Sequence, residues 1–287
     1  RCNLHSRKQK FDIVLHLGYT SDSIWFWLWP KKSIHITNMD GQEWKRVKFS
    51  PAVRNFLKYA EKMAVKGSRW LVADSKPIEN YLLEKYSKPV SYIAYGAEIP
   101  ASFQLETLKQ YGLENGKYDL VIARMEPENN IEMMIEAKLQ SNDSTLLVIV
   151  GNSNNYQLEL KKKYRNQEKI QFLNAIYEKE KINSLRYFCR LYLHGHSVGG
   201  TNPSLLEAMA CSCLIVAHKN PFNEAVLGAD ADYFSNADEL SKLFQKIDFS
   251  TKEVRSQNNL MKIQREYNWE KITNDYELLF ADAIHSK

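Results

Sequence analysis

Short apolar segments alternate with stretches of helical periodicity along the whole chain, and this alternation is what most limits the possible folds. The apolar segments consist of β-branched and other large apolar side chains with few polar interruptions. Such strands have both faces covered, as happens when crossover helices pack on both sides of a parallel sheet. The sequence therefore predicts an α/β protein with doubly wound parallel sheets.

Four strands are predicted in the first part of the chain and five in the second. Their intervals contain helical patterns, as in residues 51–66, where apolar residues recur every three or four positions. The predicted strands cover residues 11–18, 33–39, 70–75 and 90–96, then 118–124, 144–152, 169–175, 190–196 and 213–219. The predicted helices cover residues 51–66, 130–141, 156–165, 178–188, 203–211 and 236–247, and two more between 251 and 284 that break near residues 268–269.

The charge distribution divides the chain into two parts. Residues 1–100 contain 17 Lys and Arg against 9 Asp and Glu, whereas the remaining residues contain 22 against 25. We predict a partial N-terminal domain over 1–100, a second domain over 101–268 after the linker at Pro100, and a C-terminal helix over 269–287. The basic first domain is expected to favour a polyanion, an anionic membrane surface or a phosphorylated ligand.

The apolar stretches and the cysteines do not have the patterns of a membrane-spanning protein, a cysteine metal site or a disulfide framework. The longest apolar stretch is far shorter than the roughly 20 residues that a membrane-spanning helix needs. The four cysteines, at positions 2, 189, 211 and 213, have neither metal-site spacing nor the pattern of a disulfide framework. Buried free thiols and a reducing cytoplasm are expected. The chain begins with Arg1 rather than Met, so we expect that an N-terminal piece is absent.

The stretch HGHSVGGTNPSLLEAMACS (194–212) joins a predicted strand to a predicted helix. Gly199 and Gly200 allow backbone N–H groups to approach a ligand, and Thr201 or Asn202 suits the N-cap of a helix that begins at Pro203. A phosphate group fits such a helix start. The alternative is an ordinary capped turn, and the spacing matches neither a P-loop nor a dinucleotide fingerprint.

Two charged residues accompany this loop. Glu207 follows it inside an apolar helix, where a carboxylate can accept hydrogen bonds from both hydroxyls of a ribose. Arg124 ends the strand over 118–124, where a guanidinium can bind a diphosphate. The alternatives are a solvated helix glutamate and a salt bridge at a strand end.

Other polar clusters have ordinary explanations. Asp230 and Asp232 form a DxD before a short strand, but no further carboxylate or histidine clusters with them, so no metal site is expected. Trp25, Trp27 and Trp29 precede a basic Lys31–Lys32 pair. This stretch suits either a contact with a membrane interface or a core helix beside a solvated basic face. No nucleic-acid-binding pattern is present.

Several long motifs together resemble a known family. HGHSVGGTNPSLLEAMA, followed by NPFNEAVLG (220–228) and combined with ARMEPENN (123–130), is similar to the donor domain of GT-B glycosyltransferases of family 4. NMDGQEWKR (38–46) and VADSKPIENYL (72–82) resemble the bacterial rhamnosyltransferase-like subgroup of polysaccharide and O-antigen assembly. The resemblance implies the GT-B architecture, in which two Rossmann-like domains face a cleft, with the N-terminal domain truncated here.

The resemblance also assigns the donor-binding residues, with two departures from the family pattern. In the family's E-x7-E motif the second glutamate, which binds the ribose, falls on Glu207, but the first falls on Gly199. The arginine–lysine pair that binds the diphosphate falls on Arg124 and Asn129, so the lysine is missing. Backbone groups of residues 199–202 are expected to replace part of what is lost.

Three further positions are implied by the resemblance. Ile176 lies where family members bind the nucleotide base, and Gly151, at the end of the strand over 144–152, belongs to the same donor-binding set. Asp40 lies near the place of a family histidine beside the reacting sugar and is assigned a catalytic role together with Arg124. The last helix is expected to cross back to the first domain.

The implied activity is retaining, metal-independent glycosyl transfer. A hexose or deoxyhexose, with rhamnose favoured, would pass from a dTDP- or UDP-linked donor to a lipid-linked saccharide acceptor in surface polysaccharide synthesis. No cofactor and no nucleic-acid partner are expected, and the location is cytoplasmic or peripheral at the inner face of the cell membrane, in contact with anionic lipid. Two alternatives stay open: a GT-B-like nucleotide-sugar 2-epimerase and a non-catalytic module that binds nucleotide sugars.

Overall fold

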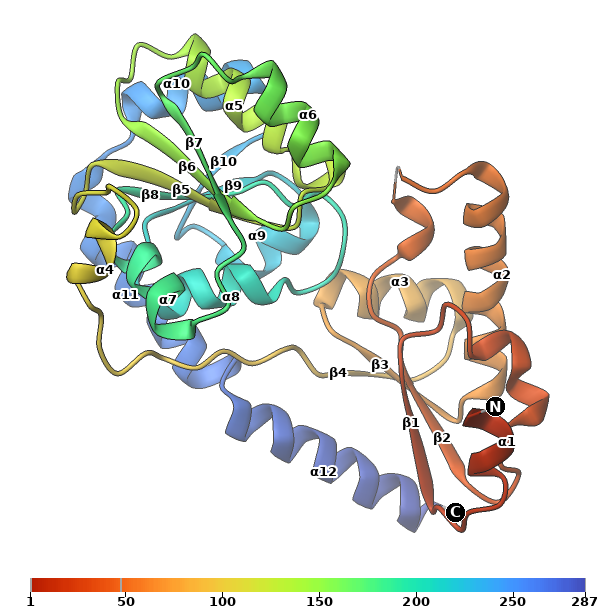
Figure 1. Ribbon diagram of the computed structural model, residues 1–287. Helices are drawn as coiled ribbons and strands as arrows, with labels where there is room; N and C mark the ends of the chain where they lie inside the picture. Colours follow the sequence, from red (N-terminus) through yellow and green to blue (C-terminus); the bar gives the residue numbers. More distant parts are fainter. Residues whose placement is uncertain (1, 47, 287) are drawn as a thin grey trace. The chain divides into compact units, whose positions relative to one another are not determined.

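The computed structural model describes residues 2–46 and 48–286, which form two compact units. The first unit contains the chain up to Tyr95, the short segment Val198–Thr201 and the chain from Trp269 onward. The second unit contains Gly96–Ser197 and Asn202–Asn268. Each unit has its own parallel β-sheet with helices packed on it (Figure 1). The predicted α/β class and doubly wound parallel sheets are therefore confirmed.

The sheet of the first unit has four parallel strands in the order β1-β2-β3-β4. These are β1 (Ile13–Leu17), β2 (Ile34–Asn38), β3 (Trp70–Ala73) and β4 (Val90–Tyr92). All five residues of β2 are buried, as its apolar sequence predicts. The four strands predicted in this part of the chain are confirmed, with shorter ends.

Helices of the first unit come from both ends of the chain. In α2 (Pro51–Gly67), predicted over 51–66, the Ser50 side chain caps the first turn by accepting from Val53 N. The last helix, α12 (Trp269–His285), begins close to the predicted break. The other elements are α1 (Cys2–Ser6), the 3₁₀ helices η1 (Ser23–Leu28) and η2 (Glu43–Lys45), and α3 (Lys76–Tyr86).

The sheet of the second unit has six parallel strands in the order β10-β9-β8-β5-β6-β7. Read from the other edge, this is the strand order of a doubly wound dinucleotide-type fold, with the first strand at the centre. The strands are β5 (Tyr118–Ile122), β6 (Leu146–Gly151), β7 (Ile170–Asn174), β8 (Leu191–His194), β9 (Ile215–His218) and β10 (Asp232–Phe234). All five strands predicted here are confirmed.

Helices cover both faces of this six-stranded sheet (Figure 1). One face carries α5, α6 and α10, whose apolar side chains form a continuous core with the strands, and the other carries α7, α8 and α11. All of them lie where helices were predicted. The elements are η3 (Pro127–Asn129), α4 (Glu106–Lys109), α5 (Ile131–Gln140), α6 (Asn155–Lys163), α7 (Lys179–Phe188), α8 (Pro203–Ala210), α9 (Pro221–Leu227), α10 (Ala237–Lys246), η4 (Phe249–Thr251) and α11 (Lys252–Glu266).

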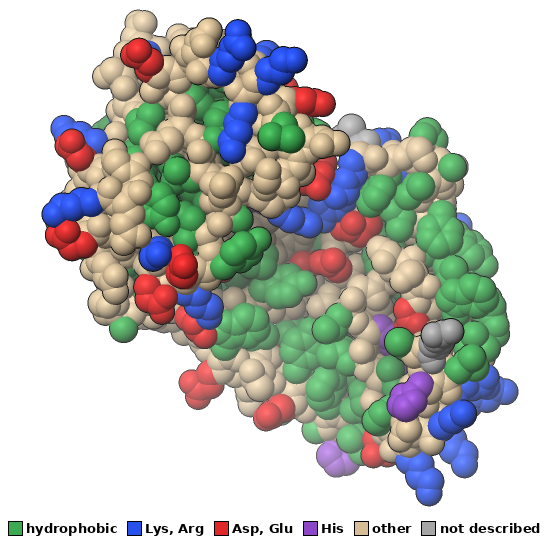
Figure 2. Space-filling model, in the orientation of Figure 1, with side chains coloured by type: hydrophobic (Ala, Val, Ile, Leu, Met, Phe, Trp, Pro, Cys, Tyr) green, Lys and Arg blue, Asp and Glu red, His purple; other side chains and the backbone are tan. Residues whose placement is uncertain are grey.

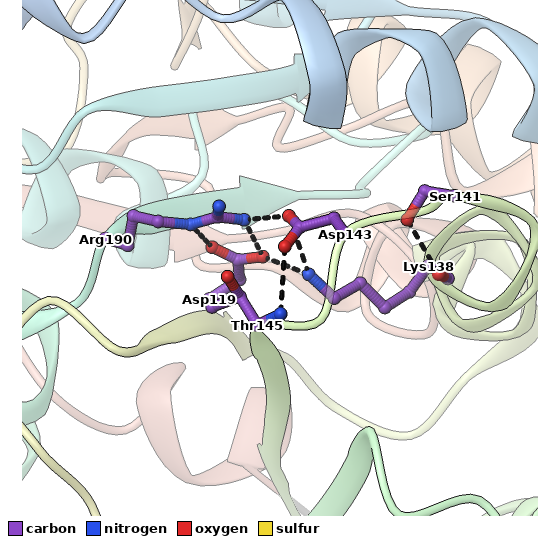
Figure 3. A network of polar contacts seen from close by, with 6 residues as sticks. All are labelled: Asp119, Lys138, Ser141, Asp143, Thr145 and Arg190. Carbon is purple, nitrogen blue, oxygen red and sulfur yellow. Dashed lines mark hydrogen bonds and ion pairs between the residues drawn. The ribbon is translucent and has the colours of Figure 1, made fainter.

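A buried ionic network holds the amino end of β5 (Figure 3). Asp119 in β5 and Lys138 in α5 are both fully buried, and Lys138 Nζ lies 2.8 Å from Asp119 Oδ2. Arg190 donates to both oxygens of Asp119 at 2.8 and 2.7 Å and also pairs with Asp143. Burial alone would raise the pKa of the Asp143 carboxyl, but hydrogen bonds from Thr145 and Arg190 bring it well below its usual range. This network fixes the strand that carries the candidate site at its other end.

Three of the four cysteines are buried free thiols, as the sequence predicts, and two histidines of the first unit form hydrogen bonds. Cys189, Cys211 and Cys213 are buried free thiols, and Cys2 is exposed. The ring nitrogens of His16 and His35 lie 3.0 Å apart, and His35 Nε2 lies 2.9 Å from the carbonyl oxygen of Pro30.

Candidate donor site at the strand switch point

The centre of the second sheet is the point at which its strand order reverses. β5 lies between β6 and β8, so the chain leaves β5 toward one edge of the sheet and later returns to β8 on the other side. In open sheets of this kind, ligands bind outside the carboxyl ends of the strands at this switch point. The two loops that begin there contain Arg124 and the 195–202 stretch, both of which the sequence predicted to be functional.

Hydrogen bonds join these two loops. Asn130 Nδ2 donates to the carbonyl oxygen of Gly195 at 2.8 Å. Ser197 donates to the carbonyl oxygen of Glu128 from its backbone N at 3.1 Å and from Oγ at 2.8 Å. A Cβ on Gly195 would lie 2.2 Å from the Asn129 carbonyl oxygen, so only glycine permits this approach. The structure therefore holds the start of the 195–202 stretch, up to Ser197, against the loop that follows β5.

The loop after β6 completes the same edge. Asn152 Oδ1 accepts from Met125 N at 3.0 Å, and Asn154 Nδ2 donates to Met125 O at 2.6 Å. A Cβ on Gly151 would lie 2.4 Å from the Ala123 carbonyl oxygen. Close packing against the β5 loop therefore explains the glycine at position 151, and its role in donor binding stays a prediction.

Arg124 lies just beyond β5 with an exposed side chain. Its carbonyl oxygen accepts from Glu126 N at 2.8 Å and from Asn129 Nδ2 at 2.7 Å, which closes the turn under it. Asn129, where a lysine was expected from the resemblance, is only 4% exposed. Asn129 therefore positions the backbone that carries Arg124. Its side chain is too deeply buried to bind a diphosphate in place of the expected lysine.

The helix start after β8 has the predicted form. Asn202 Oδ1 accepts from Ser204 N at 2.9 Å, and Pro203 occupies the first turn of α8. Of the two predicted caps, Asn202 is therefore the one observed. Gly199 has a φ of 142°, in the region that side chains other than glycine rarely adopt. Backbone conformation thus gives a physical reason why this loop has no glutamate at position 199.

The segment Val198–Thr201 packs within the first unit. Thr201 Oγ1 donates to the carbonyl oxygen of Asp74 at 2.5 Å, and a Cβ on Gly200 would lie 1.9 Å from Asp74 Oδ1. The Asp74 side chain therefore leaves no room for a Cβ at position 200, which explains the glycine there. Whether residues 199–202 also bind the donor stays a prediction.

Glu207 lies in α8 beside buried residues on both sides, as predicted, but its own side chain is 47% exposed. It forms an ion pair through Oε2 with Arg186 of α7, whose side chain is only 3% exposed. A buried guanidinium thus fixes the orientation of the carboxylate. Arg186 was not predicted as a site residue, and its one sequence signal is a cation inside the amphipathic helix predicted over 178–188.

Ile176 lies farther along the same edge. It follows β7 and lines a hollow of about 490 Å³ together with Tyr111, Lys161 and the strongly exposed Tyr177. β7 is the edge strand and β6 separates it from β5, which places the end of β7 about 10 Å from that of β5. The hollow suits a planar group at that distance from Arg124, and base binding at Ile176 stays a prediction.

The first unit brings two carboxylates to the carboxyl ends of its strands. Asp40 follows β2 in a left-handed conformation with a φ of 48°, and its backbone N donates to Asn38 Oδ1 at 2.9 Å. Asp74 follows β3, is 1% exposed, and its Oδ1 has no hydrogen-bond partner among the described residues. Burial and the nearby charge of Asp40 raise the pKa of Asp74 to about 7. Asp74 was not predicted as a site residue.

A cavity of about 270 Å³ lies beside Asp40 in the first unit. Its wall includes Leu17 at the end of β1, Tyr95 after β4, and Trp269 and Tyr276 of α12. Trp269 is 48% exposed, and Asn38 Nδ2 donates to Tyr276 Oη at 3.1 Å. One carboxylate beside several aromatic rings is an arrangement that suits a sugar, because hydroxyls bind the carboxylate while C–H groups pack on the rings. This cavity was not predicted either.

Replacing Asp74 with asparagine is expected to change how stability depends on pH. The raised pKa means that folded Asp74 holds its proton more tightly than the unfolded chain does, so its contribution is complete below about pH 4 and is lost as the pH rises through 7. The D74N variant, which stays neutral, should gain melting temperature relative to the parent as the pH rises from about 4 to 7. Thermal unfolding of both proteins across this range measures the difference, and a constant difference would contradict the raised pKa.

The remaining polar candidates do not form a metal site. Asp230 pairs with Lys262 and Asp232 pairs with Arg255, so both carboxylates of the DxD are neutralised by α11. No group of three His, Cys, Asp or Glu side chains that could hold a metal is found in residues 2–46 and 48–286. His194 is buried, neither of its ring nitrogens has a hydrogen-bond partner among these residues, and burial lowers its pKa well below the usual value.

Two family models match parts of this chain, and solved structures share its fold. Residues 104–260 match the family described as glycosyl transferases group 1, and residues 31–98 match a domain of unknown function (DUF1972). The search of curated proteins found no match.

Solved structures share the fold over nearly the whole chain. Sucrose-phosphate synthase from Thermosynechococcus elongatus is 16% identical, with a TM-score of 0.81, over 96% of this chain and 74% of that one. Anabaena HepE, in complex with UDP and glucose, is 16% identical, with a TM-score of 0.80, over 98% of this chain and 80% of that one. A glycosyltransferase from Rickettsia africae is 17% identical, with a TM-score of 0.74, over 96% and 78%. With its two Rossmann-like units, the chain belongs to the glycosyl transferases group 1 family and is a glycosyltransferase of the GT-B fold.

Proposed function

We propose that this glycosyltransferase binds a UDP- or dTDP-linked hexose or deoxyhexose, with rhamnose favoured, at the carboxyl edge of the second sheet. It transfers the sugar, with retention of configuration, to a lipid-linked saccharide in surface polysaccharide synthesis. The observation that carries the proposal is the joined pair of loops at the strand switch point, with Arg124 on one and the start of α8 on the other. The structural similarity to HepE, which was solved in complex with UDP and glucose, supports the choice of donor class.

The proposed donor site stabilises negative charge with groups of the chain itself. When the glycosidic bond breaks, negative charge develops on the departing diphosphate, and prepositioned cations and N–H groups lower the energy of that state. The Arg124 guanidinium supplies charge-assisted hydrogen bonds, and the first turn of α8 supplies backbone donors and the positive end of the helix dipole. Glu207, held by Arg186, accepts from the ribose hydroxyls. We therefore propose metal-independent transfer.

The proposed acceptor sugar occupies the cavity beside Asp40. Its aromatic wall, with Tyr95, Trp269 and Tyr276, fits the apolar face of a sugar ring. Asp40 accepts from the acceptor hydroxyl and orients it, while the leaving phosphate takes the hydroxyl proton in a same-face reaction. We thus propose that Asp40 contributes to catalysis by orienting the acceptor hydroxyl. The neighbouring Asp74 adds negative charge to this site only when its carboxyl is ionised.

A donor panel tests the proposal directly. The affinities of UDP, dTDP and GDP are measured by calorimetry, and consumption of the matching nucleotide sugars is measured with and without a lipid-pyrophosphate-saccharide acceptor. Acceptor-dependent turnover of a dTDP- or UDP-sugar is the expected result. Turnover without acceptor would assign the protein as a 2-epimerase instead, and nucleotide binding without any turnover would assign it as a binding module.

Replacing Arg124 with alanine is expected to weaken UDP or dTDP binding by about 10- to 100-fold, because charge-assisted hydrogen bonds to the diphosphate are lost. The R124K variant should recover part of the loss, since lysine keeps the charge without the fork geometry. Calorimetry with the nucleotide and with the free nucleoside separates a loss of diphosphate binding from a general loss of the site. The affinity for the nucleoside should not change. The matched control is R165A, which removes an exposed arginine elsewhere in the second unit. Equal affinity of R124A and R165A would remove Arg124 from the site.

A further inference from the structure

Large aromatic side chains lie exposed on the surface of the first unit. Trp25 and Trp27 of η1 are 48% and 54% exposed, and Phe56 and Tyr59 of α2 are 43% and 51% exposed. We call these four residues the aromatic face. Soluble proteins rarely expose so much aromatic surface in one place unless it binds a partner. We propose that the aromatic face, with the cations beside it, docks this protein on an anionic lipid bilayer.

The exposure of Trp25 and Trp27 follows from how η1 is anchored. Trp29, two residues later, is 4% exposed and stacks on His16 with 3.9 Å between ring centroids. Ser23, at the start of η1, donates to the carbonyl oxygens of Tyr19 and Ala60 at 2.5 and 2.8 Å. Both ends of the segment are therefore fixed, and the two tryptophans between them point away from the core. The predicted alternative of a buried core helix is wrong for these two residues.

The helix α2 continues the same surface. Its inward side contains the buried residues Leu57, Ala60 and Ala64, which pack in the unit. Phe56 and Tyr59 lie on the exposed side at a spacing of three residues, followed by the exposed Lys62 and Lys66. Lys66 Nζ lies 5.6 Å from the centroid of the Phe26 ring in η1, so the cationic end of this stripe adjoins the tryptophan segment. The two elements that carry the aromatic face, η1 and α2, therefore pack against each other.

Cations gather around a hollow next to η1. The hollow has a volume of about 580 Å³ and is lined by Arg7, Lys8, Lys10, Lys31 and Lys32, with Asp12 as its acidic residue. Lys31 and Lys32 come four and five residues after Trp27 in the chain, so the basic hollow adjoins the η1 segment of the aromatic face. Figure 2 shows hydrophobic side chains on the right of the view, over α2 and η1, with Lys and Arg side chains below them.

This combination of groups favours a bilayer over other partners. Tryptophan and tyrosine rings prefer the interface between lipid and water, and Lys and Arg next to them are attracted to anionic headgroups. A nucleic-acid duplex would use the cations, but its bases are stacked inside the helix and would leave the aromatic face without a partner. Among the described residues, no helix combines the length and apolarity needed to cross a bilayer, so the proposed contact is peripheral. Its link to a lipid-linked acceptor rests on the proposed function, but the contact itself does not.

Vesicle co-sedimentation tests the proposal. The protein is mixed with phosphatidylcholine vesicles with and without about a third of phosphatidylglycerol, at low and at high salt. Binding to the anionic vesicles that weakens at high salt is the expected result. The W25A/W27A variant, which loses interfacial rings, and the K31E/K32E variant, which reverses two charges, should each bind at least about tenfold more weakly.

Matched controls come from the second unit. L158A/V254A removes two exposed apolar side chains, and K242E/K246E reverses two exposed charges on α10. Both controls should bind vesicles as the parent does. Equal losses in the control variants, or no loss in W25A/W27A, would overturn the proposal.

Further measurements distinguish a bilayer from other partners of the aromatic face, and distinguish failure of this proposal from failure of the proposed function. Sedimentation without lipid detects self-association, and a dimer that W25A/W27A abolishes would assign the aromatic face to a second copy of the chain. Short duplex DNA that competes fully with the vesicles would assign only a general affinity for polyanions. UDP binding, measured on the parent and on the same variants, should not change between them. Intact nucleotide binding in a parent that fails to bind vesicles would therefore reject the docking surface and leave the proposed donor site standing.

Discussion

Replacing Glu207 with alanine is expected to weaken the binding of UDP or dTDP by about 10- to 100-fold, because a carboxylate that accepts from ribose hydroxyls contributes charge-assisted hydrogen bonds. The same change also removes the partner of Arg186, a side chain that is 3% exposed. The variant should therefore lose stability as well, since a buried guanidinium is left without its counter-charge. Calorimetry gives the affinity, and urea unfolding gives the stability.

Two variants distinguish these effects of Glu207. R186M removes the cation without touching the carboxylate, so it should change affinity less than E207A does if Glu207 itself contacts the nucleotide. E159A, which removes an exposed helix glutamate of the second unit, is the matched control and should change neither property. If E207A and R186M weaken nucleotide binding equally, then Glu207 acts only as the structural partner of Arg186.

Replacing Asp119 with alanine is expected to destabilise the second unit by about 3–5 kcal/mol, the usual cost of breaking a buried ion pair. Asp119 and Lys138 are both fully buried, and Arg190 also donates to the Asp119 carboxylate, so the substitution leaves two cations without their main partner (Figure 3). Urea denaturation followed by tryptophan fluorescence and circular dichroism measures the loss.

The control for Asp119 is an exposed pair of the same unit. Glu98 and Lys179 form an ion pair with side chains 68% and 75% exposed, and E98Q should cost no more than about 1 kcal/mol. A loss in D119A as small as that in E98Q would mean that water or Asp143 compensates the two cations. UDP affinity in D119A, measured where the protein is still folded, should stay close to that of the parent, because Asp119 lies at the amino end of β5 and Arg124 beyond its carboxyl end.

Most of the fold could be predicted because the strands are nearly uniformly apolar. Leu147–Val150, for example, are all at most 1% exposed, so their composition alone reveals a strand covered on both faces. Strand ends were predicted too long, as at β4, which stops at Tyr92 although the apolar pattern runs on to residue 96. Apolar residues beyond a strand still pack in the core, and pattern alone does not separate them from residues that pair in the sheet.

Parts of the candidate site could be predicted because of their place at strand ends. Arg124 directly follows a strand, and Asn202 and Pro203 have the residue types of a helix start, so their positions follow from local sequence. The Arg186–Glu207 pair, in contrast, joins residues 21 positions apart on two helices. Nothing in either segment by itself specifies the other.

The sequence by itself determined which segments become strands and helices, which residues cap them, and which loop carries the glycines at positions 199 and 200, because these depend on local propensity, polarity and backbone conformation. Only the tertiary structure decided that β5 pairs with β8 across about 70 residues of chain, that α12 returns to complete the cavity beside Asp40, and that Trp25 and Trp27 stay outside while Trp29 is buried. These outcomes depend on which surfaces fit together when the whole core is packed, and that information is distributed over segments far apart in the chain.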